Sequence, residues 1–257
     1  MAALRRAYVL AVFGFLYGPI ALMTAHSVNA SRYGIGWKGF TLDWYRRLAQ
    51  NRLLLEAAGN SVLVAMTAAT AATGLGALVA VALHRYRFRG RKILGGLLLV
   101  VLVSPDIVMA ISLLCLFVAA GLPLGFGTLF LAHVTFCLPF VAVTVYSRLQ
   151  GFNPHLVEAA LDLGAGEWLA FRRVVLPLAW PAVVAGWLLS LALSLDDVIV
   201  SFFVTGPSFE VLPLRIYSMV RLGVKPEVNA LGTLLFAAPL TAVLLAHRFW
   251  NREEIDR

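Results

Sequence analysis

The sequence predicts an all-α integral membrane protein that crosses the membrane as about six helices. Hydrophobic residues make up 61% of the 257 residues and charged residues only 13%, far from the balance of a water-soluble globular domain. Apolar runs of about 20 residues, the length that a helix needs to cross a hydrocarbon core of about 30 Å, recur along the chain. These spans are helical because lipid offers the backbone no other hydrogen-bond partner.

The apolar runs place six spans in a single transmembrane domain of residues 1–257. Val28-Asn29-Ala30, after the first run, loosely fits a signal-peptide cleavage site. We favour an uncleaved first span, because this run is longer than the roughly 7–15 apolar residues of a signal peptide. The predicted spans are 7–27, 58–83, 93–120, 127–147, 179–204 and 230–249.

Basic residues lie in short clusters between the apolar runs. Membrane topology therefore explains the net charge of +8 better than a nucleic-acid partner does. The loop "HRYRFRGRK" is the clearest cluster, and the positive-inside rule places it and both chain termini in the cytoplasm. Small residues in span 58–83 (Ala68, Ala72, Gly74 and Gly76) and a GxxxG at Gly14 and Gly18 predict close helix packing.

Three aspartates interrupt two of the predicted spans. An ionised side chain at mid-bilayer costs roughly 2.5–3.5 kcal/mol, so these residues must face protein, water or a cationic ligand. Ser190, Ser194, Asp197 and Ser201 fall within about 60° on a continuous helix and form a polar stripe. Asp196 would point about 100° away from Asp197, so we expect one to line a passage while the other pairs with a neighbouring helix.

The third aspartate lies in "SPDIVMA" and has two interpretations. In the first, Ser104 caps a half-helix, Pro105 takes its first position, and Asp106 complements its positive end. In the second, Asp106 joins Asp196 and Asp197 in a passage that attracts a cationic ligand. Both interpretations remain open at this stage.

Motifs for catalysis or for binding of nucleotide or metal are missing from the sequence. It contains no GxxxxGK[ST], HExxH, GxSxG or paired CxxC, so any energy source must lie in another protein. The five histidines and two cysteines are scattered, which argues against a metal site. We expect His133, near the middle of a span, to be a hydrogen-bonded packing residue.

The polar segment 148–178, here called the coupling segment, contains an informative pattern. Gly164 can adopt the positive φ that ends a short helix, and Pro177 can begin the next one. Glu158-Ala159-Ala160, then Gly164, then Val174-Val175-Leu176-Pro177 resembles the EAA motif of ABC-importer permeases, with Val174 in place of Ile. An amphipathic loop lying on the membrane surface is the alternative.

The resemblance extends over nearly the whole chain. The blocks "LHRYRFRG", "SPDIVMAISLL", "LDDVIVSFFVTGPSFEVLPLRIYSMV" and "PEVNALGT" are similar to permeases of spermidine/putrescine ABC importers. This implies a type I ABC-importer permease fold in the bacterial inner membrane and no enzymatic activity. It also implies four partner subunits: a homologous second permease, two copies of an ATPase that hold ATP and Mg²⁺, and an extracytoplasmic polyamine-binding protein. This chain itself would hold no cofactor.

The resemblance also implies roles for individual residues. Contacts with the ATPase would come from Glu158, Ala159, Ala160, Gly164 and Pro177. Glu167, which follows Gly164, is either a further contact or a solubilising charge. The substrate pathway would use Asp106, Asp196, Asp197 and Ser194, with Trp44 at the outer mouth, where an aromatic ring can bind an ammonium group. Anchoring at the membrane interface is the alternative role for Trp44.

Two other functions are compatible with the sequence. One is an ABC permease for a different solute, and the other is a proton-coupled secondary transporter that uses the aspartates as relays. The EAA pattern weighs against the second.

Overall fold

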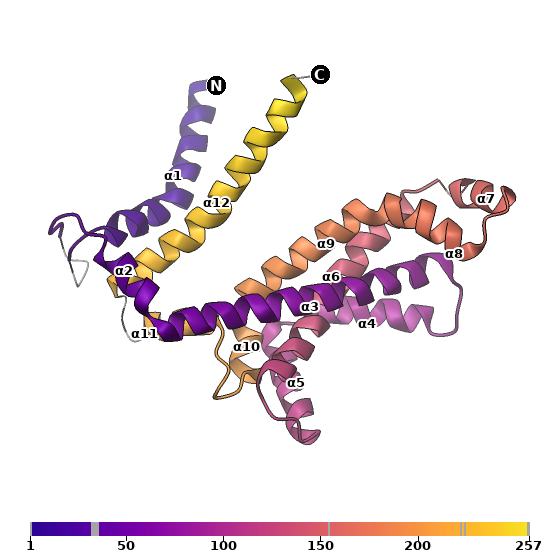
Figure 1. The fold of residues 1–257 in the computed structure, drawn as a ribbon, viewed down its shortest axis with the longest axis horizontal. Helices are drawn as coiled ribbons and strands as arrows, with labels where there is room; N and C mark the ends of the chain where they lie inside the picture. Colours follow the sequence, from indigo (N-terminus) through magenta and orange to yellow (C-terminus); the bar gives the residue numbers. More distant parts are fainter. Residues whose placement is uncertain (1, 32–35, 154, 222, 224, 256–257) are drawn as a thin grey trace. The chain divides into compact units, whose positions relative to one another are not determined.

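The computed structural model describes residues 2–31, 36–153, 155–221, 223 and 225–255 (Figure 1). This part of the chain is predominantly helical and has no strand, only an isolated bridge between Asn29 and Phe40. The all-α class is therefore confirmed. The chain divides into two compact units, one of residues 1–55 and 215–257 and the other of residues 56–214. A single domain over residues 1–257 stays a prediction.

The first unit contains helices α1 (Ala2–Ser27), α2 (Asp43–Gln50) and α12 (Pro226–Ile255). Helices α1 and α12 pack side by side (Figure 1). A Cβ atom on Gly232 would lie 2.6 Å from Met23 Sδ, so α12 contacts α1 closely at the flexible end of the Met23 side chain. The predicted spans 7–27 and 230–249 lie within α1 and α12.

The second unit holds most of the remaining helices. Helix α3 begins in the first unit and α11 ends in it. In chain order, these helices are α3 (Arg52–Arg85), α4 (Arg91–Val103), α5 (Asp106–Ala119), α6 (Phe126–Gln150), α7 (His155–Asp162), α8 (Glu167–Ala170), the π-helix η1 (Phe171–Val175), α9 (Leu176–Asp196), α10 (Ile199–Val204) and α11 (Leu212–Arg221).

Helix α6 is the centre of the second unit. Of its most apolar 18 residues 61% are buried, against 17% in the helix that contains α9. Val141 of α6 lies between Gly76 of α3 and Gly186 of α9, where added Cβ atoms would come within 2.8 and 3.1 Å of Val141 side-chain atoms. Ala68 and Ala72 are fully buried, whereas Gly14, Gly18 and Gly74 have open space around them. Close packing through small residues is thus confirmed for part of span 58–83.

Four helices of the described chain are long and apolar enough to cross a membrane: Arg5–Ser27, Arg52–Arg85, Phe126–Gln150 and Glu167–Asp196. The pair α4 and α5 gives a fifth if it counts as one broken span. The total of about six, and the placement of both termini in the cytoplasm, stay predictions.

Two of the predicted spans are wrong as continuous helices. Span 93–120 is broken into α4 and α5, and the chain bends by 114° between them. Pro105 explains the break, because proline cannot donate a backbone hydrogen bond and forces the residue before it into an extended conformation. Span 179–204 is broken at Asp197 and Val198 into α9 and α10. These two breaks create the site described next.

Candidate functional site

The three predicted aspartates line one cavity of about 670 Å³ in the second unit. Asp106 comes from the start of α5, while Asp196 and Asp197 come from the end of α9 and the break after it. The apolar part of the lining includes Met109, Phe136, Phe140 and Leu193. The structure thus brings together carboxylates that are 90 residues apart in the sequence, inside a largely apolar wall.

The α4–α5 break places Asp106 at the rim of this cavity. Ser104 and Pro105 are both extended, and α5 begins at Asp106 itself. The predicted capping was wrong, because the Ser104 hydroxyl donates back to Val100 O of α4 at 2.7 Å and Pro105 precedes the helix rather than starting it. Asp106 does lie in the first turn of α5, where the helix dipole favours a negative charge.

The α9–α10 break changes the geometry of the two adjacent aspartates. Helix α9 ends at Asp196, and Asp197 has an extended conformation. The expected 100° separation was therefore wrong, because it assumed a continuous helix. Asp197 caps the next helix: its two carboxylate oxygens accept hydrogen bonds from the backbone N–H groups of Val200, at 3.1 Å, and Ser201, at 2.7 Å.

His133 of α6 bridges the break in a neighbouring helix. Its Nδ1 lies 2.6 Å from the Ser194 hydroxyl, before the break, and its Nε2 lies 3.2 Å from the Ser201 hydroxyl, after it. The same Nε2 is 3.6 Å from a carboxylate oxygen of Asp197. The side chain is only 1% exposed. A hydrogen-bonded, buried His133 is confirmed, but its contact with Asp197 was not predicted.

The three carboxylates differ in their exposure and in their contacts within the protein. Asp197 is 10% exposed and has three neighbours that hold it in place, whereas Asp106 and Asp196 are exposed. Within the described chain, neither Asp106 nor Asp196 has a basic or hydrogen-bonding side-chain partner. These two acids are therefore open to solvent at the cavity, whereas Ser194, predicted for the substrate pathway, is buried against His133 and is not part of the lining.

Trp44 belongs to the first unit and is nearly buried, at 5% exposed. Its indole N–H donates to Asn29 O at 2.8 Å, and the Arg47 guanidinium lies over its ring at 5.1 Å. Trp44 thus packs within its own unit and does not line the acidic cavity. The aromatic rings that line the acidic cavity are instead Phe136 and Phe140, which sequence reasoning missed because phenylalanine is common in any span.

The coupling segment has the predicted local structure as far as Gly164. Helix α7 carries Glu158, Ala159 and Ala160, and it ends before Gly164, whose φ is +84°. Gly164 N–H donates to Leu161 O and Ala165 N–H donates to Ala160 O, the pair of bonds that defines a Schellman motif. The expectation that Pro177 begins a separate helix was wrong, because the backbone is already helical from Glu167 through η1 into α9.

Two acidic side chains of this segment contact basic side chains near the surface. Glu158 lies 2.8 Å from His155 Nδ1 in its own helix. Glu167 lies 3.4 Å from Arg85 at the end of α3, a partner that the sequence did not reveal. From Glu167 the chain continues as one helix of 30 residues, through the π-helix η1, to Asp196 at the cavity.

Comparison with known proteins agrees with this architecture. Residues 72–252 match the family model described as "Binding-protein-dependent transport system inner membrane component". The chain is 57% identical over 241 residues to the spermidine/putrescine transport system permease protein PotC of Escherichia coli strain K12, covering 94% of this chain and 91% of that one. It is 42% identical over 252 residues to the putrescine permease PotI of the same organism, covering 95% and 90%.

Solved structures share the fold. A bacterial ABC transporter involved in the import of alginate matches with a TM-score of 0.74 at 16% identity, covering 97% of this chain and 95% of that one. An amino acid ABC transporter matches with a TM-score of 0.60 at 20% identity, covering 83% and 100%. From its sequence relatives and its fold together, the chain belongs to the binding-protein-dependent transport system inner membrane components, the non-enzymatic permease subunits of ABC transporters.

Proposed function

We propose that this chain is the permease subunit of an ATP-driven importer of spermidine and putrescine. The observation that carries the proposal is the cavity in which Asp106, Asp196 and Asp197 meet. The similarity to PotC and PotI supports the same substrate class, because both relatives are named as permeases for these amines.

The chemistry of the cavity suits an extended polyamine. A polyamine carries several ammonium groups separated by methylene chains, so it needs carboxylates at intervals and apolar surface between them. Asp106 and Asp196 would bind ammonium groups, and Met109 and Leu193 would contact the methylenes. Phe136 and Phe140 add ring faces, over which a desolvated ammonium gains up to about 2 kcal/mol.

The remaining machinery would come from partner subunits. The proposed assembly has a homologous second permease, two copies of an ATPase that bind ATP and Mg²⁺, and an extracytoplasmic polyamine-binding protein. The coupling segment would contact the ATPase through α7 and α8. The helix that starts at Glu167 and ends at Asp196 is about 45 Å long at 1.5 Å per residue, so a movement at its start would reach the cavity directly.

The test is spermidine uptake by the assembled importer in proteoliposomes. Asp106→Asn and Asp196→Asn each remove a charge that we expect to contact an ammonium group. A charge-assisted hydrogen bond contributes about 1.5–3 kcal/mol, so uptake at low substrate concentration should fall at least about tenfold. Asp197→Asn keeps an oxygen that can cap α10 and tests the third charge separately.

Asp43→Asn is the matched control, because Asp43 is exposed at the start of α2 and does not line the cavity. This variant should transport normally. If all three cavity variants assemble, hydrolyse ATP and import spermidine like the unaltered protein, the acidic pathway is wrong. A different result would refute polyamines as the substrate class. In that case ATP hydrolysis would be stimulated by a binding protein loaded with another solute and not by one loaded with a polyamine.

A further inference from the structure

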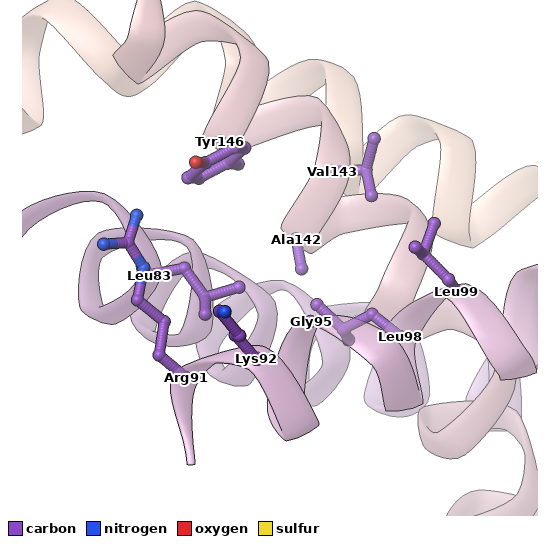
Figure 2. Close-up of a pocket in the computed structure, with 9 residues that line it drawn as sticks. All are labelled: Leu83, Arg91, Lys92, Gly95, Leu98, Leu99, Ala142, Val143 and Tyr146. Carbon is purple, nitrogen blue, oxygen red and sulfur yellow. The ribbon is translucent and has the colours of Figure 1, made fainter. Parts of the chain in front are cut away.

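A second cavity, of about 490 Å³, lies where the start of α4 meets the ends of α3 and α6. Its lining does not overlap with that of the acidic cavity. Figure 2 shows Arg91 and Lys92 extending from the first turn of α4 toward the space beneath Tyr146 of α6. Leu98, Leu99 and Val143 form the wall farther along α4 and α6.

The charged end of this cavity has no counter-charge within the described chain. No acidic residue lines it, and the first turn of α4 contains no acid. Arg47 and Arg85, by contrast, each have a carboxylate within 4 Å, whereas no such ion pair involves Arg91 or Lys92 among the described residues. Two adjacent cations at the edge of an apolar groove therefore favour an anionic ligand.

The rest of the cavity indicates that the ligand also has an apolar part. Its wall is apolar and includes Leu99 of α4, whose side chain is 60% exposed. In a chain that spans a membrane, exposed apolar helix surface next to a basic loop lies where acyl chains begin and head groups end. A free inorganic anion would use the basic end only, whereas a lipid would use both.

We propose that this cavity binds an anionic phospholipid. Its phosphate would lie between Arg91 and Lys92, with Tyr146 nearby, and one acyl chain would follow Leu98, Leu99 and Val143. Juxtamembrane basic residues contribute about 1 kcal/mol each toward anionic lipid, which corresponds to about fivefold in affinity per residue. Lipid bound here would fix α4 against α6, the helix that carries His133.

The charge test uses the full-length chain in a mild detergent, titrated with phosphatidylglycerol or phosphatidylcholine and followed by native mass spectrometry. We expect phosphatidylglycerol to bind at least tenfold more tightly. The double variant Arg91→Gln/Lys92→Gln should lose most of that preference. The double variant Arg87→Gln/Arg89→Gln is the matched control, since it removes the same charge from exposed residues of the same loop that do not line the cavity.

The shape test changes no charge. Gly95 lines the cavity and Gly96 does not, and a Cβ atom on either one meets nothing within 4 Å. Gly95→Leu should therefore fill the groove and weaken phosphatidylglycerol binding severalfold, while Gly96→Leu should leave it unchanged. The proposal is wrong if both double variants lose the lipid preference equally, or if the two lipids bind with equal affinity. It is also wrong if Gly95→Leu does not weaken phosphatidylglycerol binding, or if inorganic phosphate displaces the lipid fully.

Discussion

His133 determines how the α9–α10 break is held, although it belongs to neither helix. Its two ring nitrogens contact one hydroxyl on each side of the break, Ser194 and Ser201. Ser201 also donates its backbone N–H to Asp197. A single buried imidazole thereby sets the distance between the end of α9 and the start of α10, and with it the position of the Asp197 carboxylate.

Replacing this imidazole should loosen the break. In His133→Ala the hydroxyls of Ser194 and Ser201 lose their partner inside the protein, and leaving buried polar groups unsatisfied costs about 1–3 kcal/mol. We expect a lower unfolding temperature in detergent and reduced spermidine uptake, because Asp197 loses one of its three neighbours at the cavity. Thermal unfolding and uptake measured on the same preparation check both effects.

Thr135→Ala is the control for the His133 substitution. Thr135 lies two residues away on α6, is exposed, and bonds only to Leu131 O of its own helix. It should unfold and transport like the unaltered protein. Unchanged stability and uptake in His133→Ala would show that the break is held by other contacts.

The residue types at this site were predictable, but their partners were not. A charged side chain inside an apolar run must be satisfied by protein, water or ligand, which singled out Asp106, Asp196 and Asp197 from the sequence. The packing of Val141 against Gly76 and Gly186 determines which face of α6 meets α9. The sequence around His133 therefore could not predict its contact with Asp197.

At the scale of elements, the sequence predicted the long helices but only one of the two breaks. The half-helix interpretation of "SPDIVMA" anticipated the Pro105 break, although residues 93–120 are apolar enough to span. The Asp197 break contains neither proline nor glycine, and it forms because the Asp197 carboxylate bonds to backbone N–H groups of α10. An aspartate side chain that bonds to backbone N–H groups can replace the helical hydrogen bonds and end a helix. The sequence pattern signals this only weakly.

The coupling segment supplies an element-scale prediction at Gly164. Its φ of +84° costs an L-residue roughly 1–2 kcal/mol, so Gly164→Ala should loosen the Schellman turn that ends α7. We expect hydrogen exchange of the last α7 amides to accelerate about 5–30-fold and substrate-stimulated ATP hydrolysis to fall.

Gly166→Ala provides the comparison for Gly164. Gly166 has an ordinary φ of −67°, and a Cβ atom there meets nothing within 4 Å, so alanine should be tolerated. Equal exchange rates in the two variants would show that the turn does not depend on the left-handed conformation.

Helix packing in the second unit gives another prediction. In Gly76→Ala the new Cβ atom would lie 2.8 Å from Val141 Cβ and 3.0 Å from Leu138 O, which is closer than packed atoms tolerate. Overpacking of this kind costs about 1–3 kcal/mol, so the unfolding temperature should fall. Gly74→Ala, two residues earlier in open space, should be neutral. An unchanged unfolding temperature in Gly76→Ala would mean that α3 and α6 can move apart freely.

At the scale of the whole molecule, much apolar surface is left uncovered by the chain itself. None of the most apolar 18 residues of α1 is buried, which suits a helix that faces lipid or another subunit. The coupling segment is different, because its residues 155–166 lie outside the four long apolar helices and yet expose Leu163. Apolar side chains displayed on a short polar segment favour contact with a protein rather than with acyl chains.

Assembly should therefore depend on Leu163, which is 89% exposed in the isolated chain. If the ATPase covers this side chain, burying it contributes about 1.5–3 kcal/mol, and Leu163→Asp should weaken the association at least about tenfold. The measurement is the amount of ATPase that co-purifies with the tagged permease at limiting concentration. Leu122→Asp makes the same change at an exposed leucine in the α5–α6 connection and should retain the ATPase. Equal retention by both variants would place the ATPase contact elsewhere, whereas loss confined to Leu163→Asp would locate it at the turn between α7 and α8.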